Sequence, residues 1–141
     1  MRSSEPTCAG TFVVNQYAAR QLRYGGAIVN ISSSVAGLAL PTYAAYAACK
    51  TAVEAITRVL STELRKREIT VNAVAPGVEP PGTPADIANL VAFLVGEDGH
   101  CVNGQVIHAT RDHVNDDGFA WTLAEGERHP RLGQVGRTTS G

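Results

Sequence analysis

The sequence predicts an α/β fold in which a small parallel sheet, of about three strands, is flanked by helices. Two observations support this prediction. Segments with helical spacing of apolar residues alternate with short β-branched runs, and the connections between them suit parallel pairing through right-handed crossovers. A chain of 141 residues fits one compact domain. We divide it into a folded part, residues 1–110, and a polar tail, residues 111–141, which we expect to be disordered.

The first two elements are a helix and a strand. The spacing predicts a helix over residues 10–24, which ends at the pair Gly25-Gly26. Its apolar stripe consists of Phe12, Val13, Tyr17 and Leu22. The run from Ala27 to Ile31 is typical of a buried parallel strand. It leads into three consecutive serines and a loop that contains Gly37 and Pro41.

The next pair is the longest helix and a second strand. A helix is expected over residues 42–66, with one apolar face formed by Val53, Ile56, Leu60 and Leu64. A strand follows from Thr70 to Ala75 and ends at Pro76-Gly77. Residues 78–82 hold two prolines and a glycine, which exclude regular structure there.

A third helix and strand complete the folded part. Thr83 is expected to cap the helix, with Pro84 at its first position and Asp86 completing a capping box. The predicted buried face consists of Ile87, Leu90, Val91 and Leu94. Residues 104–109 form the last predicted strand.

Composition excludes several classes of function. A net charge of −1 and a pI near 6.4 argue against nucleic-acid binding. The four histidines show no ligand spacing, so no metal site is expected. No apolar run is long enough to cross a bilayer, and the first residues lack the apolar stretch of a signal peptide. We therefore expect a cytoplasmic protein without membrane or nucleic-acid partners.

The three cysteines are Cys8, Cys49 and Cys101, an odd and scattered set without a Cys-x-x-Cys pair. This pattern predicts neither a disulfide framework nor a metal site, and it fits a reducing compartment.

The residues with the clearest chemical potential are Tyr46, Lys50 and Ser33. A spacing of four places the Tyr46 phenol and the Lys50 ammonium on one helix face, where the cation favours the phenolate form. Ser33 follows a strand at the edge where open α/β sheets bind ligands, and its hydroxyl suits donation to a carbonyl oxygen. Taken alone, the Tyr-x-x-x-Lys pair is more typical of a buried tyrosine beside a snorkelling lysine than of a catalytic pair.

Three longer blocks surround these residues: GAIVNISS (26–33), PTYAAYAACK (41–50) and ITVNAVAPG (69–77). They resemble the short-chain dehydrogenase/reductases, most closely the members named 3-oxoacyl-(acyl carrier protein) reductases. The thirteen residues from Ser33 to Tyr46 match the usual family spacing, and the resemblance continues through PADIA (84–88) and VNGQVI (102–107). It covers roughly residues 10–109 and implies the C-terminal portion of a Rossmann-type doubly wound parallel sheet.

The resemblance also implies roles for single residues. Ser33 would polarise the substrate carbonyl, and Tyr46 would donate the proton and contact the cofactor. Lys50 would hold the nicotinamide ribose of NAD(P)H and tune Tyr46. The backbone at Pro76-Gly77 would face the nicotinamide. Ser32 and Ser34 are rivals for the serine role, but the spacing and the Asn-Ile-Ser-Ser register favour Ser33. Cys49 replaces a small serine, as a packing substitute or, less in keeping with the pattern, as a reactive thiol.

Four departures from the family pattern bear on activity. The glycine-rich loop for the cofactor pyrophosphate is absent, and with it the residue that selects NAD or NADP. Thr7 stands where the family has an active-site asparagine. Pro76-Gly77 runs almost directly into Gly82-Thr83, without the family's substrate-binding segment, and the tail extends past the usual end. The first strand also loses its inner neighbour, which leaves an open edge.

Three functional hypotheses follow. The first is an oxidoreductase that transfers hydride between NAD(P)H and a small carbonyl or alcohol substrate, impaired because the cofactor loop and the substrate segment are missing. The second is a non-catalytic module that forms homo- or hetero-oligomers, with a full-length relative for example, through helices 10–24 and 42–66. The third is an inactive remnant.

Overall fold

The computed structural model describes residues 8–77, 83–110, 113–114 and 120–121, and it confirms the α/β class. Helices and strands alternate in the folded part: α1 (Cys8–Gln21), β1 (Ala27–Ile31), α2 (Ala44–Glu63), β2 (Thr70–Pro76), α3 (Pro84–Val95) and β3 (Val106–Ala109). Three 3-10 turns join them: η1 (Ser34–Gly37), η2 (Arg65–Arg67) and η3 (Glu97–Gly99). Two short strands, β4 (His113–Val114) and β5 (Ala120–Trp121), pair antiparallel.

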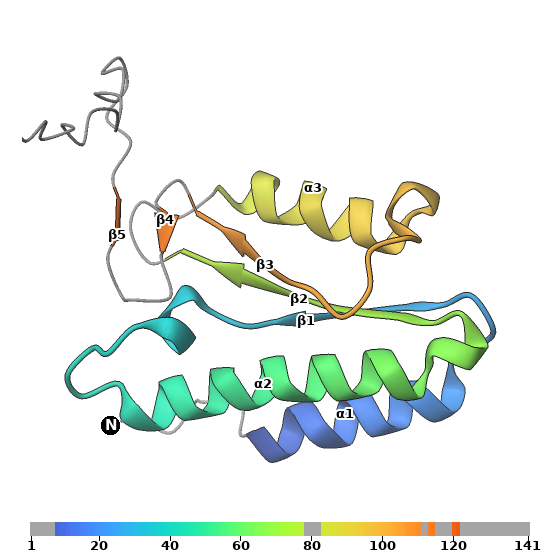
Figure 1. Ribbon diagram of the computed structural model, residues 1–141, viewed down its shortest axis with the longest axis horizontal. Helices are drawn as coiled ribbons and strands as arrows, with labels where there is room; N and C mark the ends of the chain where they lie inside the picture. The colour runs from blue at the N-terminus through green and yellow to red at the C-terminus, as the bar shows by residue number, and fades with distance from the viewer. Residues whose placement is uncertain (1–7, 78–82, 111–112, 115–119, 122–141) are drawn as a thin grey trace, which may run out of the picture.

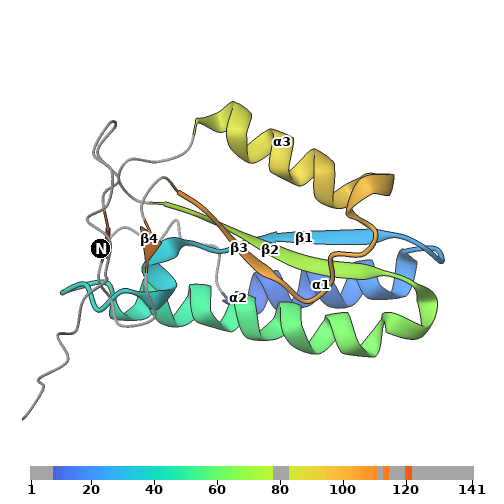
Figure 2. The ribbon, with the colours of Figure 1, turned by 45° about the horizontal axis from the view of Figure 1, so that its top comes forward.

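The sheet has the order β1-β2-β3, with both pairs parallel, as predicted. Helices α1 and α2 lie on one face and α3 on the other, so that the sheet is the middle of three layers (Figures 1 and 2). The central strand β2 is fully buried from Val71 to Ala75. Among the described residues β1 pairs only with β2.

Helix α1 turns its apolar residues outward. Phe12, Val13 and Tyr17 are 52%, 60% and 67% exposed, whereas the buried residue of the helix is the polar Asn15. Of the predicted stripe, Leu22 packs against the core formed by Leu64, Ile69 and Val71. The predicted helix therefore forms, but most of its apolar stripe faces away from the sheet.

The predicted end of this helix was wrong by three residues. The helix ends at Gln21, and Gly25 takes the left-handed conformation that turns the chain toward β1. Arg67 stabilises this early end, because its guanidinium donates to the carbonyls of Ala19 and Leu22. The sequence spacing alone gives no sign of this contact between segments 45 residues apart.

Helix α2 is also shorter than predicted. Thr42 has a positive φ of 71° and lies outside the helix, and Glu68 at φ 53° closes the 3-10 turn that follows it. This change of chain direction at Glu68 places Ile69, which is 1% exposed, in the core just before β2. The strand expected over residues 104–109 is also shorter than predicted and spans Val106–Ala109. Gly104 has a φ of +72°, which is not compatible with an extended strand.

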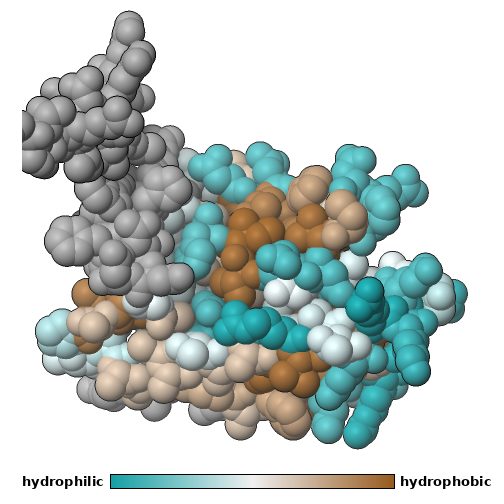
Figure 3. Space-filling view, viewed as in Figure 1, coloured by the Kyte–Doolittle hydropathy of each residue, from teal (hydrophilic) through white to brown (hydrophobic). Residues whose placement is uncertain are grey.

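Helix α3 begins as the sequence predicts. The Thr83 hydroxyl accepts from the Asp86 backbone N–H, and the Asp86 carboxylate accepts from the Thr83 backbone N–H. Leu94 is fully buried, and Ile87, Leu90 and Val91 are half-buried. The outer side keeps apolar surface, with Phe93 and Val95 44% and 54% exposed, and apolar side chains gather over this helix in Figure 3.

The expectation of an unpaired cysteine set is corrected. Cys8 and Cys49 form a disulfide, with Cα atoms 5.1 Å apart, and Cys101 is free and exposed. The sequence pattern failed because the two residues are 41 positions apart and meet only when α1 packs on α2.

Several predictions lie outside the described residues: the role of Thr7, the irregular segment 78–82, and the order of the tail apart from β4 and β5. No helix in the described part of the chain is long and apolar enough to cross a membrane. The same residues contain no cluster of histidine, cysteine, aspartate and glutamate that could hold a metal ion.

Candidate active site

Ser33 lies at the carboxyl end of β1, where the chain enters η1. Its backbone is extended, and its side-chain oxygen accepts from the Val35 backbone N–H at 3.3 Å, which makes it the cap of the turn. This hydrogen bond uses a lone pair of the oxygen and not its proton. The hydroxyl of Ser33 can therefore still donate to an acceptor.

The neighbouring serines are less suited to that role. The Ser32 hydroxyl donates to Glu54 Oε1 at 2.7 Å, across to the middle of α2. Ser32 and Ser34 are 2% and 1% exposed, against 7% for Ser33. Of the three candidates, Ser33 is thus the least buried, and the proton of Ser32 is already engaged.

Tyr46 and Lys50 lie one turn apart near the start of α2. The Lys50 Nζ sits 5.6 Å from the centroid of the Tyr46 ring, within range of a cation–π interaction. Tyr43 packs edge-on against the same ring, at a centroid distance of 6.2 Å and an interplanar angle of 87°. Tyr46 is half-buried, and its ring contacts both the Lys50 ammonium and the Tyr43 ring.

Lys50 also contacts the strand that leads to Ser33. Its Nζ donates to the backbone carbonyl of Ile31 at 3.0 Å, at the last residue of β1. This bond uses one of the three N–H groups of the ammonium and leaves the others for a ligand. The Lys50–Ile31 hydrogen bond thus joins α2, which carries Tyr46, to the end of β1, which leads to Ser33.

A cavity of about 450 Å³ adjoins Lys50, between the first half of α1 and the end of β1. Neither Ser33 nor Tyr46 lines it; its walls are formed by Gly10, Thr11, Val14, Asn15, Val29, Asn30, Ile31 and Lys50. A single pocket shared by Ser33, Tyr46 and Lys50 therefore stays a prediction.

Pro76 and Gly77 lie at the carboxyl end of β2, on the same edge of the sheet as Ser33. The Gly77 N–H donates to the Ala109 carbonyl at 3.1 Å, which extends the pairing with β3. A Cβ at position 77 would lie 2.3 Å from Thr110 Oγ1, so a larger residue does not fit without a shift. The glycine is required here by the close approach of Thr110.

A buried polar network behind the site was missed in the sequence. The side-chain amides of Asn15 and Asn30 pair with each other, at 2.8 and 3.1 Å, and Asn30 also donates to Thr57 Oγ1 at 3.0 Å. These residues join α1, β1 and α2, and all three are less than 10% exposed. The detectable signal was Asn30, a polar residue inside an otherwise apolar strand.

Comparison with known proteins matches residues 2–80 to the family described as enoyl-(acyl carrier protein) reductase, more than half of the chain. A Picea abies protein named short-chain type dehydrogenase/reductase is 37% identical over 139 residues. The chain belongs to the short-chain dehydrogenase/reductase family. This match covers 80% of the chain but 51% of the spruce protein, so the chain spans about half the length of such curated relatives.

Solved structures of this family have the same fold. The angucycline C-6 ketoreductase LanV, with bound NADP, has a TM-score of 0.67 at 33% identity, over 72% of this chain and 48% of that one. A 4-hydroxyisoleucine dehydrogenase complexed with NADH and succinate has a TM-score of 0.66 at 28% identity, over 71% and 51%. Short-chain dehydrogenase/reductases similar to this chain thus bind NADP or NADH.

The residues present fit one end of such a cofactor. The Lys50 ammonium keeps N–H groups for ribose hydroxyls, and the carboxyl ends of β1 and β2 meet at the edge where open α/β sheets bind ligands. The pyrophosphate end has no counterpart, because no Gly-x-Gly run occurs in the sequence. The described contacts of this chain thus suit a nicotinamide riboside, and the sequence has no Gly-x-Gly run of the kind that holds a pyrophosphate.

Proposed function

We propose that this short-chain dehydrogenase/reductase chain is an oxidoreductase that reduces a small carbonyl compound, or oxidises the alcohol, with NAD(P)H and with low activity on its own. The observation that carries the proposal is the position of the Lys50 ammonium, 5.6 Å from the Tyr46 ring centroid and hydrogen-bonded to Ile31 at the end of β1. Similar proteins include an NADPH-dependent aldehyde reductase-like protein and a C-6 ketoreductase, which supports the substrate class.

Ser33, Tyr46 and Lys50 are the proposed catalytic residues. The Ser33 hydroxyl keeps its proton for a carbonyl oxygen, because the bond from Val35 uses the lone pair. As negative charge develops on that oxygen, the Tyr46 phenol transfers its proton to it. The Lys50 ammonium lies 5.6 Å from the Tyr46 ring centroid, so it positions this ring beside the reacting oxygen. When bound, NAD(P)H supplies the hydride; Lys50 and the backbone at Pro76-Gly77 would hold its nicotinamide riboside.

The low activity follows from what the chain contains. A dinucleotide gains much of its affinity from a pyrophosphate at a helix N-terminus, and the sequence offers no glycine-rich turn for it.

The test is product formation by the purified chain, incubated with millimolar NADPH or NADH and a set of ketones and aldehydes. We expect slow reduction that Tyr46→Phe abolishes. Tyr24→Phe is the matched control, since Tyr24 is 66% exposed and outside the site, and it should keep the wild-type rate. Equal rates for wild type and Tyr46→Phe would show that the Tyr46 phenol is not the proton donor.

A second candidate is a non-catalytic module that pairs with another chain through α1 and α2. A groove of about 670 Å³ between these helices favours it, with exposed Phe12 and Val59 in its wall. Absence of product in every assay, together with a dimer in light scattering that Phe12→Asp dissociates, would support this candidate. Val95→Asp on α3 is the control, because Val95 is similarly exposed on the opposite face of the sheet.

A cytoplasmic location is a further proposal. The free, exposed thiol of Cys101 supports it, because an oxidising compartment tends to pair such a thiol. The Cys8–Cys49 disulfide favours an oxidising compartment instead, so the two observations point in opposite directions. Fractionation of cells that express a tagged chain tests it.

A further inference from the structure

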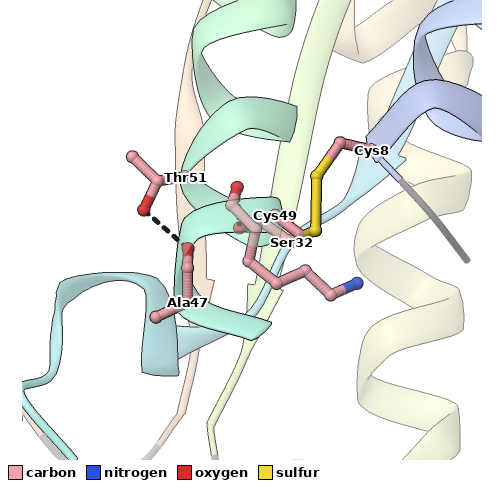
Figure 4. Close-up of a disulfide and its surroundings, with 6 residues drawn as sticks. Cys8, Ser32, Ala47, Cys49 and Thr51 are labelled. Atoms are coloured by element: carbon pink, nitrogen blue, oxygen red, sulfur yellow. Dashed lines mark hydrogen bonds between the residues drawn. A yellow bond between two sulfur atoms is a disulfide. The ribbon is translucent and has the colours of Figure 1, made fainter. Parts of the chain in front are cut away.

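The Cys8–Cys49 disulfide connects two helices beside the candidate site. Cys8 is the first residue of α1, and Cys49 lies on the second turn of α2 (Figure 4). Their Cα atoms are 5.1 Å apart, within the range that a disulfide requires. Both residues are half-buried, so neither lies in the closed core where cysteines are inert.

The Cys8–Cys49 disulfide lies next to residues that line a cavity. Cys49 directly precedes Lys50, and Cys8 precedes Gly10 and Thr11 by two and three residues. Gly10, Thr11 and Lys50 line the same cavity of about 450 Å³. The disulfide thus holds two walls of this cavity together.

The two halves of α1 are anchored differently. Its C-terminal half packs on the core through Ala19 and Leu22, and Arg67 binds the last carbonyls. Its first turns are mostly exposed, and their contacts to the rest of the fold include the disulfide and the buried Asn15. Loss of the disulfide should therefore loosen the first turns and leave the C-terminal half in place.

We propose that Cys8 and Cys49 form a reversible thiol oxidation site that clamps the first turn of α1 onto α2 in its oxidised form. The oxidant is a low-molecular-weight disulfide such as glutathione disulfide. The thiolate of one cysteine attacks it, forms a mixed disulfide and releases one glutathione thiolate. The thiolate of the second cysteine then attacks the protein-side sulfur, forms the Cys8–Cys49 bond and releases the second glutathione.

The two electrons lost by the cysteine pair reduce one glutathione disulfide to two thiols, which take up the two protons. Excess glutathione reverses both steps. The inference goes beyond the proposed function and does not depend on it, because its test uses no catalysis.

The test equilibrates the whole chain in glutathione buffers from fully reducing to fully oxidising, traps free thiols by alkylation and measures mass and hydrogen exchange. In reducing buffer we expect three alkylated thiols, and in oxidising buffer one, at Cys101, with a peptide pair joined through Cys8 and Cys49. Exchange over residues 8–15 should be on the order of tenfold faster in the reduced chain, with residues 18–22 unchanged.

Two variants distinguish the effect of the Cys8–Cys49 pair from that of Cys101. Cys101→Ser should keep the redox-dependent change over residues 8–15, and Cys8→Ser should show the fast exchange in both buffers. Three alkylated thiols in oxidising buffer, a bond that includes Cys101, or equal exchange in the two buffers would overturn the proposal. The wild-type comparison needs no variant, so poor folding of Cys8→Ser leaves the test intact.

Discussion

Lys50 Nζ donates to the Ile31 backbone carbonyl at 3.0 Å, so the helix that carries the Tyr-x-x-x-Lys pair is joined to the strand that leads to Ser33. Lys50→Met should lower the rate of product formation by roughly 100-fold, since the ammonium that would hold the cofactor ribose beside Tyr46 is lost. The free energy of unfolding should fall by only about 0.5–1.5 kcal/mol, the usual net contribution of one hydrogen bond. Lys66→Met, at the other lysine, is the control. Equal turnover in Lys50→Met and wild type would exclude the proposed role.

The Asn15–Asn30–Thr57 network should be important for stability. Thr57→Val removes the oxygen that accepts from Asn30 and leaves a buried amide N–H without this partner, so we expect a loss of about 1–3 kcal/mol in the free energy of unfolding. Thr62→Val makes the same change at an exposed position of α2 and should cost less than about 0.5 kcal/mol. Urea unfolding measures both. Equal midpoints for the two variants would show that the network contributes little.

Arg67 should stabilise the end of α1. Arg67→Ala removes the donors to the carbonyls of Ala19 and Leu22, and we expect unfolding to become easier by about 1–3 kcal/mol. Arg65→Ala, two residues earlier and exposed, is the matched control. Thermal unfolding followed by circular dichroism distinguishes them, and an unchanged midpoint for Arg67→Ala would contradict the assigned contact.

Much of the fold was predictable because it depends on local patterns. The capping box of Thr83 and Asp86 and the β-branched run of β1 involve neighbours in sequence, and both are confirmed. The end of α1 and the Cys8–Cys49 bond depend on contacts across 41 to 48 residues, which spacing does not encode. The outward direction of the α1 stripe was missed for a related reason, since helical periodicity does not say which face meets the sheet.

For the candidate site, the positions of Ser33, Tyr46 and Lys50 on their elements follow from the sequence. Their side-chain partners do not. Ser32 was a rival for the serine role until its bond to Glu54, 22 residues away, placed its proton elsewhere. The joint pocket and the assigned roles stay predictions.

Gly77 tests the packing at the end of β2. Gly77→Ala places a Cβ about 2.3 Å from Thr110 Oγ1, and we expect this overlap to cost about 1–3 kcal/mol of unfolding free energy. Gly37→Ala is the control, because nothing lies within 4 Å of a Cβ there. Thr110→Gly should restore part of the loss in the double variant. If Gly77→Ala is as stable as Gly37→Ala, the close approach of Thr110 is not a constraint.

The central claim is that this chain carries the nicotinamide side of a dinucleotide site without its pyrophosphate cradle. Lys50 and the backbone at Pro76-Gly77 can form only a few polar contacts, at roughly 0.5–1.5 kcal/mol each, against the freedom lost on binding. Calorimetric titration of the purified chain with NADPH and with NADH measures this directly. We predict dissociation constants of about 1 mM or weaker, which correspond to about 4 kcal/mol. A micromolar constant for either cofactor would contradict the account, because it would require a phosphate-binding site that the described residues do not provide.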